Sequence, residues 1–411
     1  MNERIVQLPS GLTVAVEPMV STRTAAIGVW VGVGARDEGN EQAGISHFLE
    51  HLLFKGTHTR SAIEISKAVD RVGGDINAFT SKEYTTYYCR VPARYVSSGI
   101  ELLGDVLTSP ALRDEDVASE RQVILEELAM DDDSPEDVVH RAFGRAVFGE
   151  HALGRETAGD RETVQALSPD ALRQYFGDRY RTGNTVVSIA GAIDADEVID
   201  QITKAFDAMP QGDGRVARAA PAPTPASDPK NIMIDDDTEQ VHLVMGGRSL
   251  ARTDTDRETL DVVNHVLGGG LSSRLFDEIR ERRGLAYSVF SSATSYCDSG
   301  AWTIYAGTLP EHATEVGELV RVELARLLAD GITDDELEIA KGFLTGSYEM
   351  GLEDSGARMS RLGGQLMLLG ELRSVESQIE RWLSVTHDDV DRVVRRVYGA
   401  TPHVNVALGP G

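Results

Sequence analysis

A stretch of linker composition near the middle of the chain constrains its architecture most. Residues 210–229, "PQGDGRVARAAPAPTPASDP", are rich in Pro, Ala and Gly and show no apolar periodicity. A chain of 411 residues is also too long for one hydrophobic core, because domains usually hold about 150 residues. We therefore predict an N-terminal domain over residues 1–209, a linker over 210–229 and a C-terminal domain over 230–411.

The two parts of the chain run through the same order of segments. Each has two β-rich segments, a helix, a glycine-containing turn, two further strands and two long helices. The long helices are expected at about 93–109, 114–130, 310–329 and 333–351. Tyr88 and Pro92 also recur as Tyr305 and Pro310 at nearly the same separation. This order predicts an internal duplication with two homologous α+β domains, each a mixed β-sheet with helices mainly on one face.

Composition excludes several classes of partner. The chain carries 66 Asp plus Glu against 40 Lys plus Arg, a net charge of −26, which repels nucleic acid and anionic membrane surfaces. The longest apolar run, "TAAIGVWVGVGA", is shorter than the roughly 20 residues that a membrane span needs, and the N-terminus lacks a signal-like apolar segment. Cys89 and Cys297 are too few for a disulfide framework. We expect a cytoplasmic protein with no nucleic-acid or membrane partner.

The segment "GISHFLEHLLFKG", residues 44–56, predicts a helix with two unlike faces. His47 and His51 lie about 40° apart around the helix axis and Glu50 about 60° to the other side of His47, whereas the apolar residues occupy the opposite arc. Two histidines at i and i+4 can bind one Zn²⁺, and a neighbouring carboxylate can take a proton from water. The competing interpretation is an amphipathic helix whose His and Glu side chains face solvent. A chance His-x-x-Glu-His pattern is rare, so we predict a metal site.

A catalytic zinc site usually has a third protein ligand, and "SERQVILEELAM" offers one. In a helix over this segment, Glu120 and Glu127 are two turns apart and emerge on the same side. We assign Glu127 to the metal and Glu120 to accepting a ring N–H from one of the ligand histidines. Glu126 and Glu115 are predicted to be solvated.

These motifs resemble a known family. "HFLEHLLFKGT", "GGDINAFTSKEYTTYY" and "ERQVILEEL" resemble the pitrilysin-type (inverzincin) zinc metallopeptidases, particularly the compact two-domain branch that includes the β subunit of the mitochondrial processing peptidase and its bacterial homologues. The resemblance extends over essentially the whole chain. It implies that His47, His51 and Glu127 hold one Zn²⁺, that Glu50 is the general base and that Glu120 supports the ligands.

The resemblance also implies a place for the substrate. In such peptidases an extended peptide pairs with a strand edge, which maps here to Asn77, Ala78, Phe79 and Thr80. An internal strand after a Gly-Gly turn is the alternative for the same residues.

The second part of the chain lacks the metal motif. Its "TLDVVNHVLGGG" has only His265, which we interpret as structural. Arg280 and Tyr287 match the Arg and Tyr that the superfamily brings to the zinc from its non-metal half, where they would donate to a substrate carbonyl and its oxyanion. A surface Arg and a strand Tyr are the alternative.

The glycine run Gly268, Gly269 and Gly270 lacks the signature of a phosphate-binding loop. It resembles the glycine-rich loop that borders the peptide cavity of the processing peptidases. A helix-capping turn remains the alternative.

The resemblance finally implies an assembly and a function. Two chains would close like a clam shell around a chamber, with the zinc of one facing Arg280 and Tyr287 of the other. We expect a homodimer, with a heterodimer containing a metal-free paralogue as the alternative. The predicted function is a zinc-dependent endopeptidase that cuts unfolded peptides or leader-like and presequence-like segments. The alternatives are a non-catalytic core subunit of a larger complex and a leader-peptide-specific processing subunit.

Overall fold

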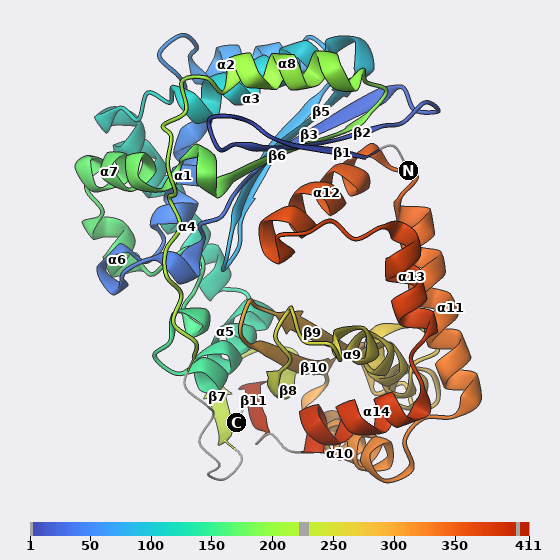
Figure 1. Cartoon of the computed structure of the whole chain (residues 1–411). Coiled ribbons are helices and arrows are strands. Elements are labelled where there is room, and N and C mark those ends of the chain that lie inside the picture. Colours follow the sequence, from blue (N-terminus) through green and yellow to red (C-terminus); the bar gives the residue numbers. More distant parts are fainter. Residues whose placement is uncertain (1–2, 222–229, 400–402, 411) are drawn as a thin grey trace. The chain divides into compact units, whose positions relative to one another are not determined.

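The computed structural model describes residues 3–221, 230–399 and 403–410 and forms two compact units (Figure 1). Unit 1 takes its described residues from Met1–Ala129, Glu156–Arg218 and Met350–Arg373. Unit 2 takes its described residues from Met130–Arg155, Ala219–Glu349 and Ser374–Gly411. The predicted domains, 1–209 and 230–411, divide the chain by its order in sequence, and this division stays a prediction. The two compact units do not coincide with these two stretches of sequence, because each stretch contributes a segment to the other unit.

The predicted linker is partly ordered against unit 1. The Gly183 N–H donates to the Gly212 carbonyl at 2.9 Å, and Arg218 donates from Nε and Nη2 to the buried Asp37 carboxylate at 2.7 Å each. Residues 222–229 of the predicted linker lie outside the described residues.

Unit 1 contains a six-stranded mixed sheet in the order β1-β2-β6-β3-β5-β4. Its strands are β1 (Arg4–Gln7), β2 (Thr13–Pro18), β3 (Thr24–Val31), β4 (Asp75–Thr80), β5 (Thr85–Pro92) and β6 (Thr185–Gly191). β2 and β6 run parallel, and the other neighbours are antiparallel. Within the part of the chain that the structure describes, β4 is therefore an edge strand.

Central strand β3 is buried on both faces, which explains its nearly continuous apolar sequence. Ile27 and Val29 enter the large core beneath the helices, whereas Ala26 and Trp30 enter a second cluster on the opposite face. The helices of unit 1 are α1 (Ile45–Leu53), α2 (Ala62–Asp70), α3 (Val96–Thr108), α4 (Asp114–Asp132), α6 (Arg161–Ala166), α7 (Pro169–Arg179), α8 (Ala195–Ala205) and α12 (Ser355–Leu369).

Helix α12 comes from the second part of the sequence but covers the second face of the unit 1 sheet. Two glycines allow its close approach, because a Cβ atom at Gly28 would overlap Met359 and one at Gly363 would overlap the Trp30 indole. Buried Glu17 of β2 pairs with Arg358 and lies 3.6 Å from Arg361 of α12.

Unit 2 has a five-stranded sheet in the order β7-β11-β8-β10-β9. Its strands are β7 (Lys230–Asp235), β8 (Val241–Ser249), β9 (Ala286–Ser295), β10 (Gly300–Thr308) and β11 (Val404–Gly409). Its helices are α5 (Pro135–Phe148), α9 (Arg257–Asn264), α10 (Ala313–Asp330), α11 (Asp334–Gly351), α13 (Val375–Leu383) and α14 (His387–Val394), with π-helical segments at His265–Gly269, Phe276–Glu281 and Arg395–Gly399.

The two sheets share one topology. The order β7-β11-β8-β10-β9 repeats β2-β6-β3-β5-β4, including the single parallel pair in each sheet. The exchange of helices is also reciprocal, because α5 from the first part covers the unit 2 sheet, with Phe143 against Gly246. The predicted α+β class, internal duplication and mixed sheets are confirmed. Strands β1 and β6 and helix α8 were not predicted.

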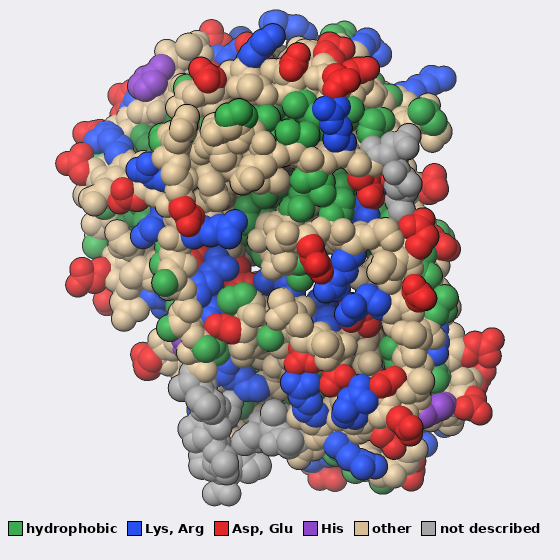
Figure 2. All heavy atoms as spheres, viewed as in Figure 1, with side chains coloured by type: hydrophobic (Ala, Val, Ile, Leu, Met, Phe, Trp, Pro, Cys, Tyr) green, Lys and Arg blue, Asp and Glu red, His purple; other side chains and the backbone are tan. Residues whose placement is uncertain are grey.

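Acidic and basic side chains are mixed over the face shown in Figure 2, despite the net charge of −26. Among the described residues, every helix is too short or too polar to cross a lipid bilayer.

Replacing Glu17 by Ala should destabilise unit 1. The substitution removes the buried carboxylate that pairs with Arg358 and lies 3.6 Å from Arg361, while Arg361 keeps its ion pair with Glu3 at 2.6 Å. Loss of a hydrogen bond to a charged group typically costs about 1.5–3 kcal/mol. Urea unfolding followed by fluorescence and circular dichroism measures the loss. Asp196→Ala is the control, because it removes an exposed ion pair with Arg4 and should change stability little. Equal stability of the Glu17→Ala variant and the unmodified chain would contradict the role of this pair.

Candidate metal centre

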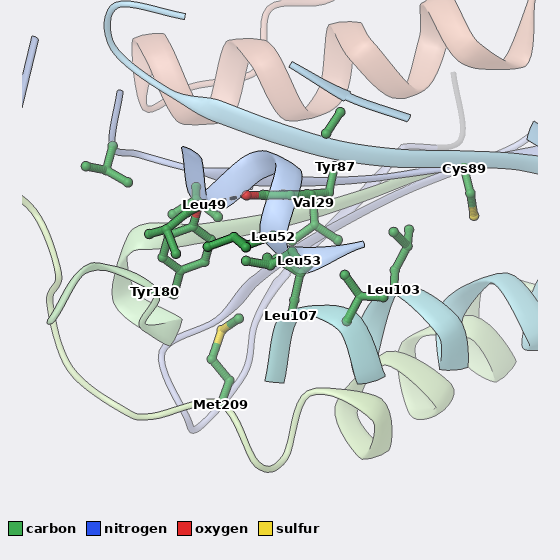
Figure 3. Close-up of a cluster of buried hydrophobic side chains, with 14 of the residues drawn as sticks. Val29, Leu49, Leu52, Leu53, Tyr87, Cys89, Leu103, Leu107, Tyr180 and Met209 are labelled. Carbon is green, nitrogen blue, oxygen red and sulfur yellow. Dashed lines mark hydrogen bonds between the residues drawn. The ribbon is translucent and has the colours of Figure 1, made fainter. Parts of the chain in front are cut away.

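The rotation of α1 about its axis is fixed by its apolar face. Leu49, Leu52 and Leu53 are at most 1% exposed and lie among side chains of the sheet and of α3 (Figure 3). Close by, the hydroxyls of Tyr87 and Tyr180 hydrogen-bond to each other at 2.8 Å. With this face in the core, His47, Glu50 and His51 are carried on the other side of the helix.

The start of α1 is fixed by a buried carboxylate. The backbone N–H groups of Gly44 and Ser46 donate to Glu38 Oε2 and Oε1 at 2.8 and 2.9 Å. Gly44 adopts a left-handed conformation (φ 91°), which favours glycine at the point where the chain enters the helix. Glu38 is thus an N-terminal cap that also complements the helix dipole.

Helix α4 presents two glutamates to α1. Val117, Ile124 and Leu128 of α4 are buried, and the Arg121 guanidinium lies 5.7 Å from the centre of the Phe48 ring. With this face in the core, Glu120 and Glu127 both reach the α1 histidines.

His47, His51 and Glu127 form a compact donor set. Their ligand atoms lie within 4.8 Å of one another, with 3.7 Å from His47 Nε2 to Glu127 Oε1 and 3.5 Å from His51 Nε2 to Glu127 Oε2. These separations are long for hydrogen bonds. They approach the spacing of about 3.4 Å between two ligand atoms on a tetrahedron with metal–ligand bonds of about 2.1 Å. Two imidazoles and a carboxylate therefore fit Zn²⁺ in chemistry and in spacing.

Glu120 and Lys55 orient the His51 ring. His51 Nδ1 lies 3.2 Å from Glu120 Oε2, and the Lys55 ammonium contacts the other oxygen of this carboxylate, whose side chain is 4% exposed. The carboxylate accepts a hydrogen bond from the Nδ1–H group, which leaves Nε2 as the lone-pair nitrogen that faces Glu127. Burial, together with the neighbouring His51, lowers the pKa of His47 to about 4, so its imidazole is neutral and able to bind a metal at neutral pH.

Glu50 is placed to act as a base. Burial raises the pKa of the Glu50 carboxyl, and the nearby Glu127 adds to that rise, while a hydrogen bond from Thr80 and the proximity of His51 oppose it. The Thr80 hydroxyl donates to Glu50 Oε2 at 2.6 Å, so this contact fixes one oxygen of the carboxylate. A raised pKa makes a carboxylate a stronger proton acceptor.

The four predicted substrate-contacting residues lie on edge strand β4, so the alternative of an internal strand is wrong. Among the described residues β4 pairs only with β5. Asn77 is exposed, Phe79 is 40% exposed beside the Trp30 and Tyr84 rings, and the Ala78 side chain faces the core. Thr80 has the additional contact with Glu50, which the sequence did not predict.

Arg280 and Tyr287 lie together in unit 2. The Arg280 guanidinium carbon is 4.6 Å from the centre of the Tyr287 ring and 4.7 Å from that of Phe276. Tyr287 is 79% exposed and lies near the start of edge strand β9. The structure thus places the half-buried Arg280 beside the exposed Tyr287.

The glycine run has a packing reason of its own. A Cβ atom at Gly268 would lie 2.6 Å from the Ser291 nitrogen, and one at Gly270 would overlap the His265 ring. Gly269 ends the π-helical segment that precedes Gly270. His265 is buried and stacks on Phe343 with ring centres 4.2 Å apart, which agrees with a structural histidine.

Two residues of the site were missed in the sequence. Lys55 lies in the turn directly after α1, four residues beyond His51, a spacing that could have revealed it. Glu38 gives no comparable signal, because it lies in a non-repetitive segment before the helix.

Comparison with known proteins bears on both parts of the chain. Residues 13–161 match the family model of insulinase, peptidase family M16, and residues 166–344 match that of the peptidase M16 inactive domain. An uncharacterized zinc protease of Streptomyces coelicolor is 43% identical over 99% of this chain and 89% of its own length. One of Bacillus subtilis is 39% identical over 95% of this chain and 94% of its own.

Solved structures of related proteins have the same fold as this chain. A protease from Helicobacter pylori superposes with a TM-score of 0.92 at 26% identity, covering 100% of both chains. A peptidase M16 inactive domain from Pseudomonas fluorescens shares the fold, with a TM-score of 0.93 at 20% identity, covering 100% of this chain and 98% of its own. The motifs, the topology and these relatives together show that the chain belongs to the pitrilysin-type M16 peptidase family.

Proposed function

We propose that the chain is a zinc-dependent endopeptidase. The observation that carries the proposal is the convergence of His47, His51 and Glu127 from two helices, with the Glu50 carboxylate beside them. A purely structural subunit would not require this donor set to be complete. The names of the relatives, zinc proteases, favour the same activity.

The residues of the chain have separate tasks in this reaction. When bound, Zn²⁺ lowers the pKa of water and polarises a carbonyl group. Glu50 takes the proton from the attacking water and later delivers it to the leaving amine, while Thr80 holds one of its oxygens in place. Glu120, paired with Lys55, keeps the Nδ1 proton on His51.

The substrate is an extended, unfolded peptide or a leader-like segment. Edge strand β4 offers backbone N–H and C=O groups, which bind a peptide with little demand on its sequence. Asn77 and Phe79 offer exposed side chains along this edge, and Ala78 contributes its backbone only. Gly268, Gly269 and Gly270 would border the peptide.

We further propose that the active form is a homodimer in which Arg280 and Tyr287 serve the site of the partner chain. Both are donors suited to an oxyanion, and the half-buried Arg280 lies against the exposed Tyr287 ring. A homodimer is the simplest assembly because one chain carries both the donor set and this pair.

Replacing Glu127 by Ala should abolish stoichiometric metal binding. The unmodified chain is expected to hold one Zn²⁺ after dialysis, and loss of a direct ligand should weaken affinity by more than about a hundredfold. Plasma mass spectrometry of the dialysed protein measures the zinc content. Glu126→Ala is the matched control, because Glu126 is the exposed neighbour on the same helix and should leave zinc content unchanged. Full zinc in the Glu127→Ala variant would refute this ligand.

Replacing Glu50 by Gln should keep zinc and fold but remove turnover. The amide cannot accept the proton, so kcat should fall by about 10²–10⁴-fold. Mass spectrometry of cuts in a mixed library of unstructured peptides measures the rate, with chelator-treated enzyme as the blank and Glu126→Gln as the control. Undiminished cleavage by a zinc-loaded Glu50→Gln chain would exclude Glu50 as the base.

Mixing two inactive variants tests the dimer. A Glu50→Gln chain and a Tyr287→Phe chain should each cleave poorly, but after subunit exchange about a quarter of the sites would pair an intact Glu50 with an intact Tyr287. Activity should therefore rise to about a quarter of the unmodified level, measured with the same peptides. If Tyr287 serves its own chain, or if the chains do not assemble, mixing restores nothing.

A further inference from the structure

Helix α8 fills a groove in unit 1. It lies against α3 and β2 (Figure 1). Its side chains Val198, Ile199 and Ile202 are buried in the large core, as is Phe206 just after the helix. Its opposite face is polar, and its Asp196 pairs with Arg4 of β1. α8 is thus an amphipathic helix that completes the unit 1 core.

Among the described residues, the equivalent groove in unit 2 is open. The duplicated topology makes α10 and β7 the counterparts of α3 and β2. Between α10 and β7 lies a cavity of about 520 Å³, on the same sheet face that α8 covers in unit 1. Within residues 230–399 and 403–410, no helix takes the position of α8.

The walls of this groove are shaped for an apolar side chain. Leu243 and Ala407 of the sheet are only half-buried, and Met233 is 53% exposed. On α10, a Cβ atom at Gly317 would meet nothing closer than the Arg321 guanidinium at 3.9 Å. A side chain from outside therefore finds both apolar contacts and free space.

The floor also differs from unit 1 in a way that suits a reversible occupant. The strand registers place Asn231 and Asn405 where unit 1 has the fully buried Val14 and Val187. Asn405 donates to Asn231 at 2.8 Å, and this polar pair lets part of the floor face water when the groove is empty. A permanently covered groove would not need it.

We propose that this groove of unit 2 binds an amphipathic helix of a partner protein. The helix presents apolar side chains at i, i+1, i+4 and i+8, the spacing by which α8 and Phe206 fill the corresponding space. An acidic residue on its polar side would face Arg321, which is 55% exposed at the rim and would exchange its surface contact with Glu318, at 3.3 Å, for the partner's carboxylate. The site is separate from the metal centre and does not depend on peptidase activity.

A labelled peptide tests the proposal on the intact chain. The probe is a fluorescein-tagged, blocked peptide of residues 194–209, which carries the α8 side chains, and fluorescence anisotropy measures its binding. We expect saturable binding with one peptide per chain. Gly317→Trp, whose indole would occupy the open space, should weaken binding by at least about tenfold.

Val322→Trp is the matched control, because Val322 is exposed on α10 outside the groove lining and the variant should bind like the unmodified chain. A peptide with Ile199 and Ile202 replaced by Asp should not bind. Circular dichroism checks that both tryptophan variants fold. Absence of saturable binding, or equal binding to the Gly317→Trp chain, would overturn the proposal.

Two other occupants would also overturn it. If Gly317→Trp, but not Val322→Trp, turns a dimer into a monomer in sedimentation velocity, the occupant is a second copy of this chain. If laurate binds in a Gly317→Trp-sensitive manner while the helical peptide does not, the occupant is a small amphiphile.

Discussion

Burial of the apolar face of α1 is the constraint on which the metal centre depends. Phe48, Leu49 and Leu52 are almost completely excluded from water, so the helix can turn only one face away from the core. That face carries His47, Glu50 and His51. Glu38 caps the helix and fixes its start, and Arg121 of α4 packs on Phe48, so Glu127 reaches the same point from a second rigid element. Fold stability and ligand geometry therefore have the same origin.

Helical periodicity accounts for what could be predicted of the site. The faces of α1 and α4 follow from the spacing of apolar residues, and the seven-residue separation of Glu120 and Glu127 places both carboxylates near the histidines. Long-range contacts carry no such signal. The exchange of α5 and α12, the Glu38 cap and the Thr80 contact with Glu50 join segments distant in sequence or outside regular elements. At Gly268 and Gly270, packing against Ser291 and His265 explains a pattern from which a substrate loop was predicted.

The duplication shows how two copies of one topology diverge. In unit 1 the helix after β3 carries two histidines on the side turned away from the core, whereas the corresponding helix of unit 2 leads into buried His265, stacked on Phe343. Unit 2 instead presents Arg280 and Tyr287 beside its edge strand. Unit 1 completes its core with α8, and unit 2 leaves the equivalent space open above a polar Asn231–Asn405 pair. The shared sheet order is the scaffold, and the differences lie in the side chains and in one helix.

The most direct test of the account is anomalous diffraction at the zinc absorption edge from crystals grown with zinc. The account predicts one strong peak per chain, within about 2.3 Å of a nitrogen of His47, a nitrogen of His51 and an oxygen of Glu127. It also predicts that Glu50 lies near the peak without bonding to it. A peak that lacks any of the three ligands, or no peak at this position, would contradict the central claim.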